Sequence, residues 1–153
     1  QRPESLGWVN IRSNDPLDKP IIQPNYLSDP EDQKVCIAGI RLARKLMHSE
    51  ALSKYLDHEL YPGEDVGDDH KELLEIARER GLTCYHQMGT CRMGPMTDKT
   101  AVVDNKLKVY GISNLRVADA SIMPTMLSAN LNAGAMMIGE KAAEIIKNDQ
   151  SNC

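Results

Sequence analysis

The stretch from Gly81 to Ala133 constrains the fold most, because it is long and shows no sustained helical or strand periodicity. Turn-forming residues interrupt it repeatedly, and only "NLRVADAS" suggests a buried strand, around 115–118. Irregular segments of this length are uncommon in a compact domain that stands alone. We therefore expect an α+β fragment whose loops lie over a scaffold outside this sequence.

Two helices are expected before this stretch. The first should span about 30–48, because Asp29 suits an N-cap and Pro30 suits the first helical position. The second should span about 70–80, between a capping-box start at Asp69 and a stop at Gly81. The apolar face of the first helix is predicted to contain Val35, Gly39, Leu42 and Leu46.

The remaining elements lie at the two ends of the chain. The alternation in "LGWVNIRS" predicts a strand, and the Pro-rich segment "NDPLDKPIIQPNYLSDP" after it predicts an extended loop. A last helix should run through "AGAMMIGEKAAEIIKN". Its predicted core face consists of Met137, Ile138, Ala142 and Ile145.

Composition excludes several classes of protein. With 153 residues and 41% hydrophobic content, the chain can form a core and is not expected to be disordered. The net charge of −4 gives no basic footprint for nucleic acid. No apolar run approaches the roughly 18 residues of a membrane span. Because the first residue is Gln1 and no signal-like segment follows, we expect the sequence to start inside a larger protein.

The segment "CYHQMGTCRMG", from Cys84 to Gly94, concentrates reactive side chains. Its histidine, His86, could be a metal ligand, a catalytic base or an ordinary loop residue. The spacing of Cys84, His86 and Cys91 does not match a zinc signature, so no metal site is expected. On local sequence alone, a solvated or hydrogen-bonded loop histidine is the typical case, and Arg92 is typical of an ion-pair residue.

A longer pattern changes this interpretation. "YHQMGTCRMG", followed by "AVVDNKLKVYGISNLRVADASIMPTMLSANLNAGAMMIGEKAAEIIK", closely resembles the C-terminal region of glucose-methanol-choline (GMC) oxidoreductases, which are FAD-dependent enzymes that oxidise alcohols. The upstream "GWVNIRSNDPLDKPIIQPNYLSDPEDQKVCIAGIRLARKL" is similar to the same family. The resemblance covers residues 3–147, leaving 148–153 as a tail, and is strongest to insect glucose-dehydrogenase-like members. It implies a piece of the FAD-binding α/β domain plus part of the antiparallel sheet and helices of the substrate domain.

The resemblance implies two catalytic residues. His86 matches the family's general base, which takes the proton of the substrate hydroxyl; a neutral imidazole suits this task near physiological pH. Asn130, in "LSANLNAG", matches a position where members carry His or Asn, and its amide would orient the substrate oxygen. Without the resemblance, Asn130 would be interpreted as a turn residue.

The resemblance also implies contacts with FAD. Asp119 and Ala120, in "VADAS", would border the phosphates and ribose. Asn132, as the N-cap of the last helix, and Ala133 after it would face the pyrimidine ring, where free N–H groups suit an anionic reduced flavin. On local sequence alone, Asp119 could make a turn hydrogen bond and Asn132 could be an ordinary cap.

The sequence departs from the family in two ways. It contains no G-x-G-x-x-G motif after a strand, so an N-terminal FAD-binding portion is expected as a partner, and residues 1–153 alone should have little activity. Gly134 stands where many members have Pro.

The expected substrate is a small alcohol or sugar, and extracellular secretion is expected from the insect-like resemblance. A non-catalytic remnant or binding module, and a thiol or metal site at Cys84, His86 and Cys91, stay as alternatives.

Overall fold

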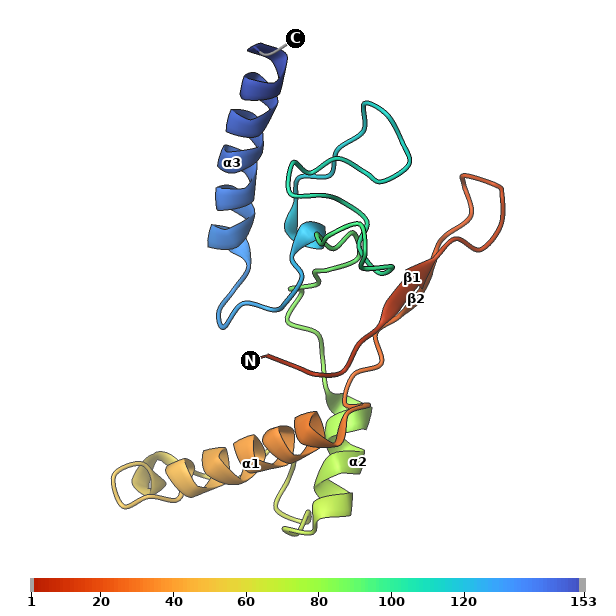
Figure 1. Ribbon diagram of the computed structural model, residues 1–153. Coiled ribbons are helices and arrows are strands. Elements are labelled where there is room, and N and C mark those ends of the chain that lie inside the picture. The colour runs from red at the N-terminus through yellow and green to blue at the C-terminus, as the bar shows by residue number, and fades with distance from the viewer. Residues whose placement is uncertain (1, 152–153) are drawn as a thin grey trace. The chain divides into compact units, whose positions relative to one another are not determined.

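The computed structural model describes residues 2–151, and the chain divides into two compact units, residues 3–83 and residues 1–2 with 84–153. In chain order the elements are β1 (Trp8–Asn10), β2 (Ile21–Gln23), α1 (Pro30–Met47), the short 3-10 helix η1 (Ser53–Tyr55), α2 (His70–Arg80), the 3-10 helix η2 (Ala120–Ile122) and α3 (Asn132–Ser151) (Figure 1). Among the described residues, no helix is both long and apolar enough to cross a membrane.

The first unit opens with a two-stranded antiparallel hairpin. Trp8 pairs with Gln23 and Asn10 pairs with Ile21. The strand predicted in "LGWVNIRS" is therefore confirmed. β2, however, lies inside the segment that we expected to be a loop, because the β-branched Ile21 and Ile22 form a short extended run between prolines.

Both predicted helices of this unit are confirmed, and their caps explain their starts. The Asp29 side chain accepts a hydrogen bond from the backbone N–H of Glu31 (2.8 Å) at the start of α1. The Asp69 side chain accepts from the N–H groups of Lys71 (2.9 Å) and Glu72 (3.1 Å) at the start of α2. These bonds satisfy N–H groups that have no acceptor within the helix.

The face of α1 that packs against α2 is not the predicted one. Ile37 is buried against Leu73 and Leu74, and the half-buried Ile40 lies beside them. The predicted core face points outward instead: Val35, Leu42 and Leu46 are each more than half exposed. The reason is geometric, since α1 carries apolar residues on two sides and α2 covers only one of them.

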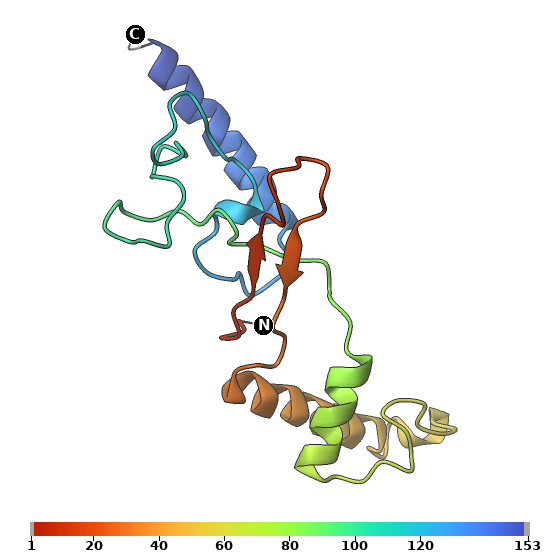
Figure 2. The same cartoon turned by 90° about the vertical axis from the view of Figure 1, so that its right-hand side faces the viewer.

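The second unit packs α3 against irregular chain (Figure 2). Its core contains the buried residues Val103, Leu107, Ile122, Met123, Leu131, Ile138 and Ala142. The predicted core face of α3 is confirmed for Ile138, Ala142 and Ile145. The prediction for Met137 is wrong, because this residue lies about 100° around the helix from Ile138 and is 61% exposed.

Two other expectations about this unit are corrected. The segment 115–118 is not a buried strand: Arg116 makes one isolated bridge with Lys108, and Leu115 is 46% exposed. α3 also continues to Ser151, so the predicted tail begins inside the helix.

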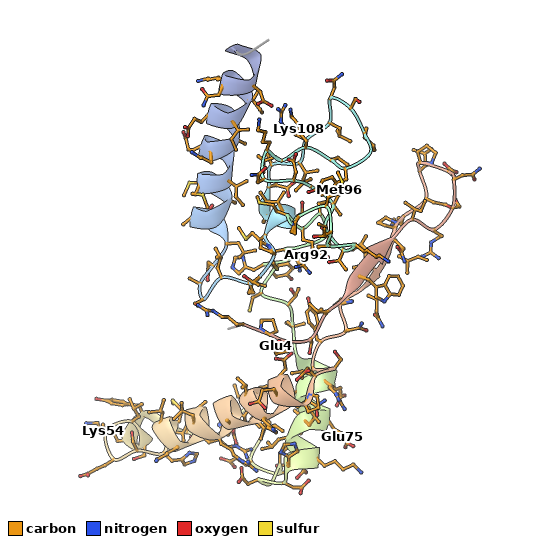
Figure 3. The ribbon with its side chains drawn as sticks, viewed as in Figure 1. Glu4, Lys54, Glu75, Arg92, Met96 and Lys108 are labelled. Carbon is orange, nitrogen blue, oxygen red and sulfur yellow. The ribbon has the colours of Figure 1, made fainter. Side chains whose placement is uncertain are left out.

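A charged cluster joins the last turns of α3 to the irregular chain. Asp149 forms ion pairs with Lys106 (3.4 Å), with Lys108 (2.8 Å) and with Arg116. Lys108 is labelled in Figure 3. The hydrogen bond from Lys108, supported by Lys106, lowers the pKa of Asp149. This cluster holds the end of α3 beside the turn at 104–108.

Candidate active site

His86 lies at the edge of the second unit's core. Its side chain is half-buried, whereas the ring of the preceding Tyr85 is 81% exposed. Tyr85 has a left-handed backbone (φ 59°), which is uncommon for a bulky residue and turns the chain sharply before His86. Met88, two residues later, packs against the core. The local backbone therefore directs Tyr85 outward and leaves His86 partly sheltered.

The residues after His86 are held by backbone hydrogen bonds to η2. The N–H groups of Gly89, Cys91 and Met93 donate to the carbonyls of three consecutive residues, Ala120 (3.4 Å), Ser121 (3.0 Å) and Ile122 (2.8 Å). This backbone ladder joins the histidine segment to the "VADAS" turn.

Gly89 is required for this arrangement. Its φ is +81°, and a Cβ atom there would lie 3.3 Å from the carbonyl oxygen of Met123. A residue with a side chain would be strained in its backbone and crowded against η2.

The predicted cofactor residues Asp119 and Ala120 lie at the start of η2. The Asp119 side chain caps η2 by accepting from the N–H of Ser121 (2.7 Å), which is the turn hydrogen bond considered from sequence. The Asp119 residue is nevertheless exposed. One carboxylate can accept several hydrogen bonds, so this cap is compatible with a hydroxyl ligand such as a ribose.

Asn130, Asn132 and Ala133 are exposed at the start of α3. The helix begins at Asn132 itself, and the carbonyl of Leu131 accepts the hydrogen bond from the N–H of Ala135 (2.8 Å). The predicted N-cap position therefore moves from Asn132 to Leu131. The first N–H groups of any α-helix lack acceptors within it, and Ala133 adds only a methyl group, so this turn fits the approach of a planar, electron-rich ring.

One core connects these segments. Met88, close to His86, and Leu131, next to Asn130, belong to the same hydrophobic cluster as Ile122. The histidine segment, the "VADAS" turn and the start of α3 are therefore all attached to one hydrophobic core.

Arg92 forms the ion pair expected from sequence. Its Nη2 atom lies 3.6 Å from a carboxylate oxygen of Asp98. Hydrogen bonds from the side chain and backbone of Thr100, with a smaller contribution from Arg92, lower the pKa of Asp98. Arg92 is labelled in Figure 3. Its Nε atom is buried and has no hydrogen-bond partner within residues 2–151.

No group of three or more His, Cys, Asp and Glu side chains within residues 2–151 is arranged to hold a metal ion. In the same part of the chain Cys36, Cys84 and Cys91 are free thiols.

Sequence reasoning missed Met123 and Leu127. These apolar residues of "IMPTMLSAN" lie against Gly134 in the first turn of α3. The signal that could have found them is a pair of apolar residues four apart in the connection that precedes a helical glycine.

Comparisons with known proteins agree on one family. The family model described as GMC oxidoreductase matches residues 3–139. Choline dehydrogenase of Homo sapiens is 48% identical over 149 residues, which cover 95% of this chain and 24% of that protein. Alcohol dehydrogenase [acceptor] of Pseudomonas putida is 47% identical over 144 residues, which cover 94% of this chain and 26% of that protein.

Solved structures match the fold as well. An FAD-dependent oxidoreductase from Chaetomium thermophilum superposes with a TM-score of 0.88 at 34% identity, covering 98% of this chain and 26% of that one. A fungal aryl-alcohol oxidase superposes with a TM-score of 0.86 at 35% identity, covering 98% of this chain and 24% of that one. The chain therefore spans about a quarter of the length of these relatives.

Proposed function

Because this chain belongs to the GMC oxidoreductase family, we propose that it supplies the active-site portion of an FAD-dependent enzyme that oxidises alcohols. The observation that carries this proposal is the backbone ladder between residues 89–93 and η2. It joins the segment of the proposed base to the turn of the proposed cofactor contacts, so both would be positioned by one rigid element.

His86 is the proposed general base. Its imidazole takes the proton of the substrate hydroxyl, and the carbon–hydrogen bond of the same alcohol breaks with loss of hydride, leaving a carbonyl product. Bound FAD would supply the acceptor for that hydride. The half-buried setting of His86 supports this role, because a base must be reachable by substrate and shielded from competing water.

Asn130 is the proposed orienting residue. An amide cannot act as the base, but its N–H₂ group can donate a hydrogen bond to the substrate oxygen. Such a bond holds the hydroxyl toward His86 and stabilises negative charge as the proton leaves. The exposure of Asn130 is consistent with a side chain that meets a ligand.

Four residues are proposed to hold the cofactor. Asp119 and Ala120 would contact its ribose and phosphates, and Asn132 and Ala133 would meet the flavin ring at the start of α3. The exposure of Asn132 and Ala133 supports this assignment, because the N–H groups at the start of a helix favour negative charge on a ligand.

A further FAD-binding portion is part of the proposal. The sequence lacks a G-x-G-x-x-G motif and spans only about a quarter of its relatives. The substrate is proposed to be a small alcohol, in keeping with relatives named for choline, alcohol and aryl-alcohol; a sugar is the alternative. Secretion stays a prediction from the resemblance.

The test is anaerobic reduction of the bound flavin by alcohols in the FAD-containing protein, followed by stopped-flow absorbance. We expect His86→Ala to slow reduction about 10²–10⁴-fold, the usual contribution of a general base. His70→Ala is the matched control, because His70 is an exposed residue at the start of α2, and it should leave the rate unchanged.

Two outcomes would contradict the proposal. If the protein binds FAD but no alcohol or sugar reduces it, the chain is a non-catalytic module, as considered from sequence. If flavin is reduced and His86→Ala matches His70→Ala, the base lies elsewhere.

A further inference from the structure

Gly134 lets the connection before α3 lie directly on the helix. An ideal Cβ atom at this position would lie 2.7 Å from Cδ1 of Leu127 and 2.9 Å from Cε of Met123. Real side-chain carbons essentially never approach so closely, so any residue with a Cβ would displace these two groups. Gly134 is itself buried, whereas Leu127 is 40% exposed.

The connection is short, and it is anchored on both sides of Asn130. Before Asn130, Leu127 rests on Gly134, and the Ser128 hydroxyl accepts a hydrogen bond from Nε of Arg2 (2.7 Å). After Asn130, Leu131 is 5% exposed and belongs to the core. Figure 1 shows this part of the chain curving back to the base of α3.

We infer that Gly134 is a positioning residue for Asn130, which deepens the function proposed above and rests on it. With Leu127 and Leu131 both held, the three residues between them, 128–130, have little freedom. The Asn130 amide is therefore presented from a fixed backbone. A side chain at position 134 moves the Leu127 anchor, and the shift passes through this short segment to Asn130.

The atoms that would clash indicate how the molecule responds. Cδ1 of Leu127 and Cε of Met123 are ends of flexible side chains, and Leu127 has solvent on one side. The methyl group that Gly134→Ala introduces would therefore push Leu127 aside rather than unfold the unit. Catalytic geometry tolerates less than folding does, since a misplacement of about 1 Å can cost about 10²-fold in rate.

Two glycines of α3 provide a matched comparison. Gly139 lies in the same helix, and a Cβ atom there would have no neighbour within 4 Å. Gly139→Ala therefore makes the same chemical change without the clash. A third variant, Gly134→Ala with Leu127→Val, moves one carbon from residue 127 to residue 134 and nearly conserves the packed volume.

The experiment measures flavin reduction by an alcohol and hydrogen exchange of the 126–135 backbone in the FAD-containing protein. We expect Gly134→Ala to lower kcat about 10–100-fold with a smaller change in KM and faster exchange. Gly139→Ala should match the unchanged protein in kcat and in exchange. The double variant should restore most of the lost kcat and most of the slow exchange. The melting temperature should not fall for Gly134→Ala or Gly139→Ala, because Ala is favoured over Gly inside a helix.

Three results would overturn the inference. The first is that Gly134→Ala matches Gly139→Ala in kcat and in exchange. The second is that the double variant restores neither kcat nor slow exchange. The third is that kcat falls only as much as the fraction of folded protein falls. Because exchange is read without turnover, it tests the anchor even if the proposed chemistry is wrong. If Gly134→Ala alters exchange and the double variant restores it, while His86→Ala leaves the rate unchanged, the proposed function fails and the packing assignment holds.

Discussion

Helix α1 presents apolar side chains on two faces, and this predicts two different mutational responses. Ile37 is 1% exposed and packs on α2, whereas Leu42 is 56% exposed on the outward face. We predict that Ile37→Ala destabilises the unit of residues 3–83 strongly and that Leu42→Ala does not.

The magnitudes follow from the buried surface. Truncating Ile37 removes three buried carbons, about 2.4 kcal/mol at about 0.8 kcal/mol for each. The cavity left against Leu73 raises the total to about 3–4 kcal/mol. Leu42 keeps more than half of its surface in water, so its truncation should cost about 1 kcal/mol or less, and the helix propensity of Ala offsets part of that.

The assay is urea unfolding of residues 1–153, followed by far-ultraviolet circular dichroism. Equal losses for the two variants would refute the assignment of the buried face. The same pair should then be measured in the FAD-containing protein. If the proposed FAD-binding portion covers the outward face of α1, the cost of Leu42→Ala should rise there toward that of Ile37→Ala.

Three further predictions use other contacts. Arg44→Lys should lower the free energy of unfolding by about 2 kcal/mol in urea titrations, because Arg44 donates at 2.9 Å to Glu59 and to two backbone carbonyls of the 63–67 loop, a fork that Lys cannot reproduce. Lys108 lowers the pKa of Asp149 from its ordinary 3.8, so this carboxylate stabilises the fold above pH 3.8 and stabilises it less as the pH falls through its folded pKa. The difference in melting temperature between the unchanged protein and Asp149→Asn should therefore become smaller below about pH 4. Gly89→Ala should lower the melting temperature by several degrees, since a left-handed backbone costs a residue with a side chain about 1–2 kcal/mol.

Helix boundaries could be predicted from sequence because their causes are local. Asp29 and Asp69 make the capping bonds expected of them, and α1 and α2 begin where those bonds require. Which face a helix buries is not local. Val35 and Leu42 have the correct helical spacing for a core face, but they lie on the side of α1 that faces away from α2.

The candidate site divides in the same way. The motif around His86 and the position of Asn130 could be recognised in the sequence by their resemblance to one family. The backbone ladder to η2 could not, because its donors and acceptors are main-chain atoms that any sequence carries. Likewise, the contact of Leu127 with Gly134 depends on how the connection folds back, which no short pattern encodes.

The arrangement of the core implies that the proposed active site responds to perturbation as a unit. Ile122 carries one rung of the ladder to the histidine segment and is buried in the same cluster as Leu131, which anchors the Asn130 connection. A core change at Ile122 therefore shifts the proposed base and the proposed orienting amide together, whereas a side chain at position 134 presses on the flexible ends of Leu127 and Met123 and reaches the amide through the Leu127 anchor. Variants at these two positions should differ in kind: the first should impair proton transfer and substrate orientation at once, and the second should impair mainly orientation.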